Sequence, residues 1–287
     1  MPGAGGLGVQ LPWPFDREYM QLALMAGCVV GACAPLIGAF LVQRRMSLLG
    51  DGIGHLAFAG VAGGLLIGVW PVWAALAVAV AGALGIEHLR ARGRTSGDLA
   101  LALFFYSGIA AGVVLVGLSD SFNAGLLSYL FGGILTVEPG EVWVVVALGA
   151  VIVATVLVCG RALFAIVLDE EAARVSGLPV NALNALLAVL AAATVVASMR
   201  VVGILLVAAM MVLPVATAQL LTRSFKATLR VSVAIGVGAV VVGLGAARAW
   251  ALAPGGTIVL TTAAAFAVAS LLLGRRRGGG PLGAGLA

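Results

Sequence analysis

Two side chains in an apolar, glycine-rich stretch are of types that bind metal ions. Asp51 and His55 stand in the segment 44–60, and the next acidic residue after them is Glu87. In a helix, residues four apart lie about 40° apart around the axis and about 6 Å along it, so both side chains would share one face. One oxygen ligand and one imidazole suit a divalent cation such as zinc or manganese. Two ligands are too few for a closed site, so such a site would need a second copy of the pair.

The same spacing also has a purely structural interpretation. Asp51 can cap the start of a helix, and His55 can be a buried histidine whose ring is hydrogen-bonded in the core. Ionisable groups inside a membrane are costly and usually indicate function. The environment of the segment therefore has to decide between the two interpretations.

The composition indicates a polytopic membrane protein. Of the 287 residues, 62% are hydrophobic and 9% are charged, whereas soluble proteins average about 25% charged residues. The net charge of +5 comes from basic residues in short loops between apolar runs, which is a topology signal and predicts no nucleic-acid partner. Cys28, Cys33 and Cys159 lie in apolar segments without CxxC spacing and are interpreted as packing residues.

The apolar runs predict an all-α membrane bundle of eight to nine transmembrane helices. Nine spans are expected, at residues 19–43, 52–69, 71–89, 98–118, 141–160, 179–198, 201–222, 229–247 and 257–274. The second span is short and the turn at Trp70 and Pro71 is tight, so eight spans is the alternative. Residues 1–18 are expected to form a flexible leader, 19–274 a single transmembrane domain, and 275–287 a basic and then glycine-rich tail.

The distribution of basic residues predicts the orientation. With the N-terminus outside and the C-terminus in the cytoplasm, 13 of the 16 basic residues fall on the cytoplasmic side. The exceptions are Arg17, Arg200 and Arg248. The positive-inside rule favours this arrangement.

An external connection, residues 119–140, carries Asp120, Glu138 and Glu141 around the apolar run 126–135. A run of about ten residues is too short to cross a bilayer, so we expect a re-entrant or surface half-helix, with a plain loop as the alternative. The nearby acidic residues are candidates for docking an external partner.

A cytoplasmic connection, residues 167–179, is predicted to contain a short helix. Acidic residues favour a helix N-terminus, and Gly177 followed by Pro179 ends it. The alternatives are a solvated loop helix and a helix that couples the bundle to a cytoplasmic motor. The candidate coupling residues are Asp169, Glu170, Glu171, Ala172, Ala173, Arg174 and Gly177.

These segments together resemble the permease subunit of the bacterial ABC importers for zinc, manganese and iron. The resemblance is carried by the stretch from Arg45 to Gly60, by the segments 129–135 and 169–177, and by the run 202–218 that contains Pro214. It implies a homodimer with the ion pathway on the two-fold axis, lined by Asp51 and His55 of each copy. It also implies that the acidic cytoplasmic helix couples to a separate ATP-binding subunit, and that an extracytoplasmic metal-binding protein delivers the ion.

The motifs of other functions are missing from the sequence. It contains no Walker A, GxSxG, HExxH or EF-hand pattern, so we expect neither catalysis nor a permanently bound cofactor in this chain, only a transported ion. Because imidazole suits zinc, zinc is the first expectation and manganese the second. Gly52 and Gly54 stand where the family more often has Ala and Ser, which predicts a looser ligand helix. A stand-alone secondary transporter and a structural membrane protein are the alternatives.

Overall fold

The computed structural model describes residues 12–91, 97–118, 124–133 and 139–277, and this part of the chain is helical with no strand. The helices are α1 (Glu18–Gln43), α2 (Leu49–Ile67), α3 (Pro71–Ala91), α4 (Gly97–Gly117), α5 (Ala124–Phe131), α6 (Pro139–Leu168), α7 (Glu170–Val175), α8 (Val180–Ser198), α9 (Val207–Leu221), α10 (Phe225–Trp250) and α11 (Pro254–Arg277). The predicted all-α membrane bundle is confirmed.

Eight helices of the described chain are long and apolar enough to cross a membrane: α1, α2, α3, α4, α6, α8, α10 and α11. The expected span at 201–222 differs, because only its second part, α9, is helical, with 15 residues. The preceding residues turn instead, with Gly203 at φ +92°. Their amides bond to the α5 backbone, Ile204 N–H to the Tyr129 carbonyl at 2.9 Å and Leu205 N–H to that of Leu130 at 3.3 Å. Pro214 lies inside α9 and does not end it.

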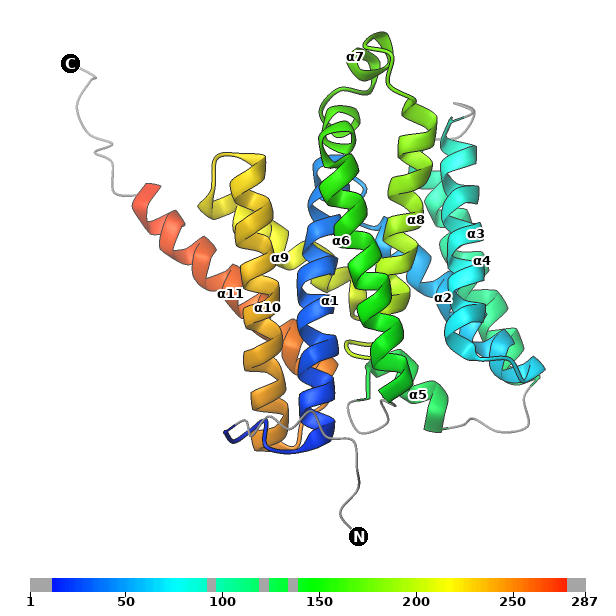
Figure 1. The fold of residues 1–287 in the computed structure, drawn as a ribbon, viewed down its shortest axis with the longest axis vertical. Helices are drawn as coiled ribbons and strands as arrows, with labels where there is room; N and C mark the ends of the chain where they lie inside the picture. The colour runs from blue at the N-terminus through cyan, green and yellow to red at the C-terminus, as the bar shows by residue number, and fades with distance from the viewer. Residues whose placement is uncertain (1–11, 92–96, 119–123, 134–138, 278–287) are drawn as a thin grey trace, which may run out of the picture.

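The helices form two groups around a shared centre (Figure 1). Helices α2, α3 and α4 pack against one another on one side, and α8 packs on α3. On the other side α1 contacts α6, α9 and α10, and α11 packs against α9 and α10. Helix α5 lies at one end of the bundle and α7 at the opposite end, on the connection between α6 and α8.

Small residues allow backbones to approach closely where α1 crosses its neighbours. A Cβ on Gly38 would collide with the backbone carbonyl of Met211 in α9. A Cβ on Gly31 would lie 2.8 Å from the carbonyl oxygen of Gly236 in α10. Close backbone packing of this kind holds helices together in lipid, where apolar association has little driving force.

Candidate metal path and coupling site

Asp51 and His55 lie on one face of α2, as the spacing predicts. Asp51 stands in the first turn, and His55 Nε2 lies 3.9 Å from Asp51 Oδ1. The Asp51 side chain is 32% exposed and that of His55 is 16% exposed. The His55 ring makes an edge-on contact with Phe105 of α4, with 4.6 Å between ring centroids. The distance is too long for a direct hydrogen bond, so a carboxylate oxygen and an imidazole nitrogen face one region without a hydrogen bond between them.

The glycines around the pair are packing positions, contrary to the expectation of a looser helix. A Cβ on Gly52 would come within 2.5 Å of the Leu101 side chain, and one on Gly54 within 3.4 Å of the Ile204 carbonyl oxygen. From the other side, Gly108 of α4 faces the backbone of His55, where a Cβ would lie 3.0 Å away. These approaches fix α2 between α4 and the turn before α9.

Asp51 borders a cavity of about 280 Å³ between α2 and α4, whose lining also includes Asp98 and Tyr106. A second cavity of about 350 Å³ shares Leu48, Asp98 and Leu101 with it. Arg44, Arg45 and Arg90 line the second cavity. Asp98, in the first turn of α4, therefore faces the same space as Asp51. The two cavities share these lining residues, and Arg44 and Arg90 of the second cavity lie beside Glu170 of α7.

The predicted cytoplasmic helix exists as α7. Some of its side chains contact the bundle and others are exposed. Asp169 caps the helix, its Oδ1 accepting the Ala172 N–H at 2.9 Å. Ala173 is buried against the bundle, whereas Glu171 and Ala172 are exposed. Gly177 ends the segment in the left-handed region at φ +82°, which glycine adopts without strain. Val175 is 90% exposed, so α7 presents an apolar side chain at the tip of the molecule.

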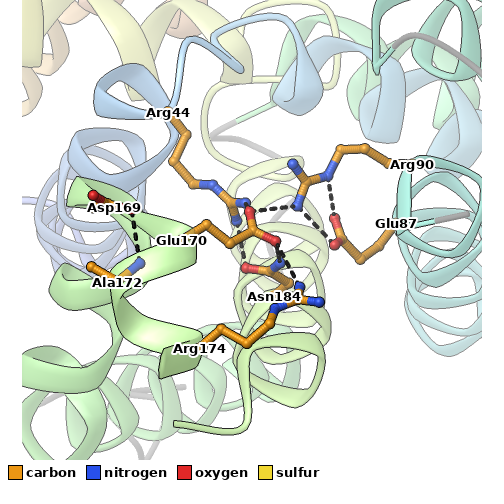
Figure 2. A network of polar contacts seen from close by, with 8 residues as sticks. All are labelled: Arg44, Glu87, Arg90, Asp169, Glu170, Ala172, Arg174 and Asn184. Atoms are coloured by element: carbon orange, nitrogen blue, oxygen red, sulfur yellow. Dashed lines mark hydrogen bonds and ion pairs between the residues drawn. The ribbon is translucent and has the colours of Figure 1, made fainter. Parts of the chain in front are cut away.

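Glu170 connects α7 to the loop before α2 (Figure 2). Arg44 Nη2 donates to Glu170 Oε2 at 2.9 Å, and Arg44 Nη1 donates to Asn184 Oδ1 of α8 at 2.8 Å. Asn184 Nδ2 in turn donates to Glu170 Oε1 at 3.2 Å. Burial and the nearby Arg90 charge lower the pKa of Arg44, and Glu170 opposes that shift. The buried guanidinium therefore depends on the Glu170 carboxylate.

The same carboxylate also faces α3 and its own helix. Arg90 of α3 lies 3.7 Å from Glu170 Oε2 and forms two hydrogen bonds with Glu87, at 2.9 and 3.0 Å. Arg174 lies 3.6 Å from Glu170 Oε1 on the more exposed side. The network thus joins four elements at the end of the bundle where the second cavity lies (Figure 2).

At the opposite end, Glu141 is buried, which removes its carboxylate from the proposed docking surface. Its side chain is 6% exposed and pairs with Arg200, whose Nε donates to Glu141 Oε2 at 2.8 Å. Arg200 also donates to Ser128 Oγ at 2.9 Å and lies over the Tyr129 ring, 4.5 Å from its centroid. The pair holds α5 against the start of α6. Asp120 and Glu138 lie outside the described residues.

Sequence reasoning placed Asp51 and His55 on one helix face and predicted α7, but it missed both ion networks. Arg44 and Glu170 are 126 positions apart, and Glu141 and Arg200 are 59 apart. Each of these arginines was interpreted only as a topology signal. The sequence signal that could have found these pairs was an acidic residue that flanks a predicted span on the same side of the membrane as the arginine. Within the described ranges, no three His, Cys, Asp or Glu side chains converge on one point.

Comparisons with known proteins agree with this architecture. A model of the ABC 3 transport family matches residues 16–273. The manganese import system permease protein ScaB of Streptococcus gordonii is 31% identical over 262 residues, 91% of this chain and 94% of ScaB. The manganese transport system membrane protein MntC of Halalkalibacterium halodurans is 32% identical over 252 residues, 88% of this chain and 86% of MntC.

A solved structure shares the fold. One chain of PsaBC from Streptococcus pneumoniae, determined in complex with Fab, superposes with a TM-score of 0.82 at 32% identity, covering 91% of this chain and 94% of that chain. The resemblance inferred from the sequence motifs is therefore confirmed over nearly the whole described bundle. The chain belongs to the ABC 3 transport family.

Proposed function

We propose that the chain is the membrane-spanning permease subunit of an ABC importer for divalent transition-metal ions, in a bacterial inner membrane. The observation that carries the proposal is the pair Asp51 and His55, held 3.9 Å apart beside a cavity inside a bundle of membrane helices. Ionisable side chains within membrane helices are rare and mark ion or substrate pathways, which argues for a function that requires this carboxylate.

The second half of the ion site comes from a second copy of the chain. Helix α4 exposes an apolar face beside the Asp51 cavity, including Leu99, Leu103 and Tyr106, of which Tyr106 is 69% exposed. Pairing two copies across this face would bring two carboxylates and two imidazoles toward one axis. Like charges brought together repel one another, and a divalent cation relieves that repulsion.

Manganese is the first candidate for the ion, in place of the zinc expected from the sequence. The relatives ScaB and MntC are named for manganese. The chemistry permits it, because carboxylate and water ligands suit manganese and imidazole is accepted by several divalent metals. Zinc remains the second candidate, since two oxygen and two nitrogen ligands also match a tetrahedral zinc site.

The energy would come from a separate ATP-binding subunit docked at α7. Val175 offers an exposed apolar contact, and Glu171 and Arg174 offer charges at the same tip. The Glu170 network would then transmit movement of α7 to Arg44 and so to the loop that precedes Asp51. The chain would lie with its N-terminus outside and its C-terminus in the cytoplasm. An extracytoplasmic metal-binding protein would deliver the ion near Asp120 and Glu138.

The deciding experiment is uptake of radioactive manganese, zinc and iron by a deletion strain carrying variants of the chain. We expect Asp51→Asn and His55→Ala each to abolish uptake while the assembled complex is retained in the membrane. His88→Ala, which alters the other, exposed histidine, is the control and should transport normally. Because imidazole must be neutral to bind metal, uptake by the unaltered chain should also fall as the external pH is lowered.

The structural interpretation makes the opposite prediction for one variant. Asp51 does not cap α2, because Leu48 is the N-cap and no side chain caps that end. Asn keeps the size and polarity of Asp51 in the first turn, so a purely structural role predicts normal uptake by Asp51→Asn. Normal transport of all three metals by that variant would return Asp51 and His55 to a packing role, and the proposed ion path would be wrong.

A further inference from the structure

A groove between α6 and α10 has the form of a lipid site that the transport function does not require. Both helices pack on α1, and the groove between them has a volume of about 530 Å³. Its walls are apolar, formed among others by Leu36, Val153 and Leu157. Leu157 and its neighbour Val158 are largely exposed, so this side of α6 faces the surroundings of the bundle rather than its core.

A polar pocket adjoins one end of the groove. Its volume is about 350 Å³, and it shares Phe164, Ser224 and Phe225 with the groove. Phe225 marks the junction, because its ring contacts those of Phe164 and Phe40 at centroid distances of 4.6 and 5.2 Å. The pocket itself is lined by polar groups that include Gln43, Gln219 and Thr222. The apolar groove and the polar pocket therefore meet at one aromatic cluster.

Three cations border this composite site, and no acidic side chain in the described part of the chain pairs with them. Arg161 and Lys226 line the groove and Arg223 lines the pocket. Among the ion pairs of the described residues, none involves any of the three. The N-terminus of α10 adds a partial positive charge at the same place, where the Ser224 hydroxyl caps the Ala227 N–H at 3.3 Å. The site is positive and complementary to an anion.

The depth of the cations matches a headgroup layer. Arg161 lies in the last turns of the long helix α6, and α10 begins at the end of the bundle that carries α7 (Figure 1). Under the orientation proposed above, this is the cytoplasmic leaflet, which is rich in anionic lipid, and basic pockets between helices there bind anionic headgroups. A soluble anion would use the cations but would leave the apolar groove empty.

We infer that the groove binds an anionic phospholipid of the cytoplasmic leaflet. One acyl chain lies along the Val153 and Leu157 wall, and the phosphate lies between Arg161 and Lys226 with the headgroup toward Gln219 and Thr222. The lipid bridges α6 and α10 around α1. The inference depends on the membrane location and orientation of the chain but not on the identity of the transported ion or on Asp51.

The test is native mass spectrometry of the purified full-length chain titrated with phosphatidylglycerol or phosphatidylcholine. We expect phosphatidylglycerol to bind more tightly, and Arg161→Gln combined with Lys226→Gln to weaken its binding by about 30-fold, which is about 2 kcal/mol at 1.4 kcal/mol per tenfold. The matched control, Arg17→Gln combined with Arg174→Gln, removes the same charge at residues that line neither the groove nor the polar pocket, and it should bind the lipid like the unaltered chain.

A second variant separates a lipid from a free anion. Gly160 lines the groove, and a Cβ there would make only an ordinary contact with Val156 at 3.8 Å, so Gly160→Leu should fold and fill the groove. It should lose phosphatidylglycerol although every cation is retained. Glycerol phosphate that binds as tightly as the lipid and is unaffected by Gly160→Leu would overturn the lipid assignment. Equal affinity for both lipids, unchanged by the charge variants, would overturn it too.

Discussion

Replacing Glu141 by Gln should loosen the end of the bundle that carries α5. The Glu141 and Arg200 side chains are 6% and 9% exposed, so the substitution removes a carboxylate that pairs with a buried guanidinium. Breaking a buried pair in this way costs about 3–5 kcal/mol. We take the lower end, about 3 kcal/mol, because Gln can still accept a hydrogen bond from Arg200 and because Ser128 and the Tyr129 ring remain in contact with it.

The consequence can be measured at the backbone that the pair supports. The Ile204 and Leu205 amides bond to carbonyls of α5, so their hydrogen exchange reports whether α5 stays in place. A local cost of about 3 kcal/mol corresponds to roughly a hundredfold faster exchange through local opening. The assay is hydrogen exchange followed by mass spectrometry on the chain in lipid nanodiscs, with peptides covering α5 and the turn before α9.

Two further variants make the measurement decisive. Glu141→Gln combined with Arg200→Met removes both charges, and Ser128 keeps its bond to the Gly125 carbonyl at 2.8 Å. Exchange in this double variant should therefore return most of the way to the unaltered rate. Glu171→Gln, an exposed acid at the other end, should have no effect on these peptides. Unchanged exchange in Glu141→Gln, or exchange in the double variant as fast as in the single one, would refute the reasoning.

Three other predictions test the coupling end and the packing of α1. Glu170→Gln removes the negative charge that pairs with buried Arg44, an interaction worth about 1.5–3 kcal/mol for a hydrogen bond to a charged group. The variant should transport less metal per ATP hydrolysed in reconstituted vesicles, and an unchanged ratio of metal to ATP would contradict this. Val175→Asp should weaken co-purification of the ATP-binding subunit at least tenfold while the chain itself inserts normally, and full recovery of the subunit would count against docking at α7. Gly38→Ala should destabilise the chain in a thermal unfolding assay by about 1–3 kcal/mol, because the Cβ meets the Met211 carbonyl, whereas Gly238→Ala, with open space around it, should not. Equal unfolding temperatures for these two glycine variants would show that the close approach of α1 to α9 does not contribute to stability.

Much of the fold follows from local sequence properties. Long apolar runs predict membrane helices because a bilayer offers no partner for unpaired backbone groups, and the observed helices begin and end within a few residues of the expected spans in most cases. The exception, residues 201–206, is equally apolar, and hydropathy cannot distinguish a helix from a turn whose amides bond to another segment. The bonds from Ile204 and Leu205 to α5 involve residues about 75 positions away, so only the tertiary structure reveals them.

The candidate site likewise depends partly on local sequence and partly on tertiary structure. The sequence by itself places Asp51 and His55 one helical turn apart and sets a capped acidic helix at 169–177, because both depend on contacts within four residues. It does not determine that Glu170 faces Arg44, that Asp98 shares a cavity with Asp51, or that Glu141 is buried against Arg200. Those pairings depend on how helices distant in the chain cross, and the crossings are set by glycine contacts such as Gly38 on α9 and Gly108 on α2, which carry no charge or periodic signal.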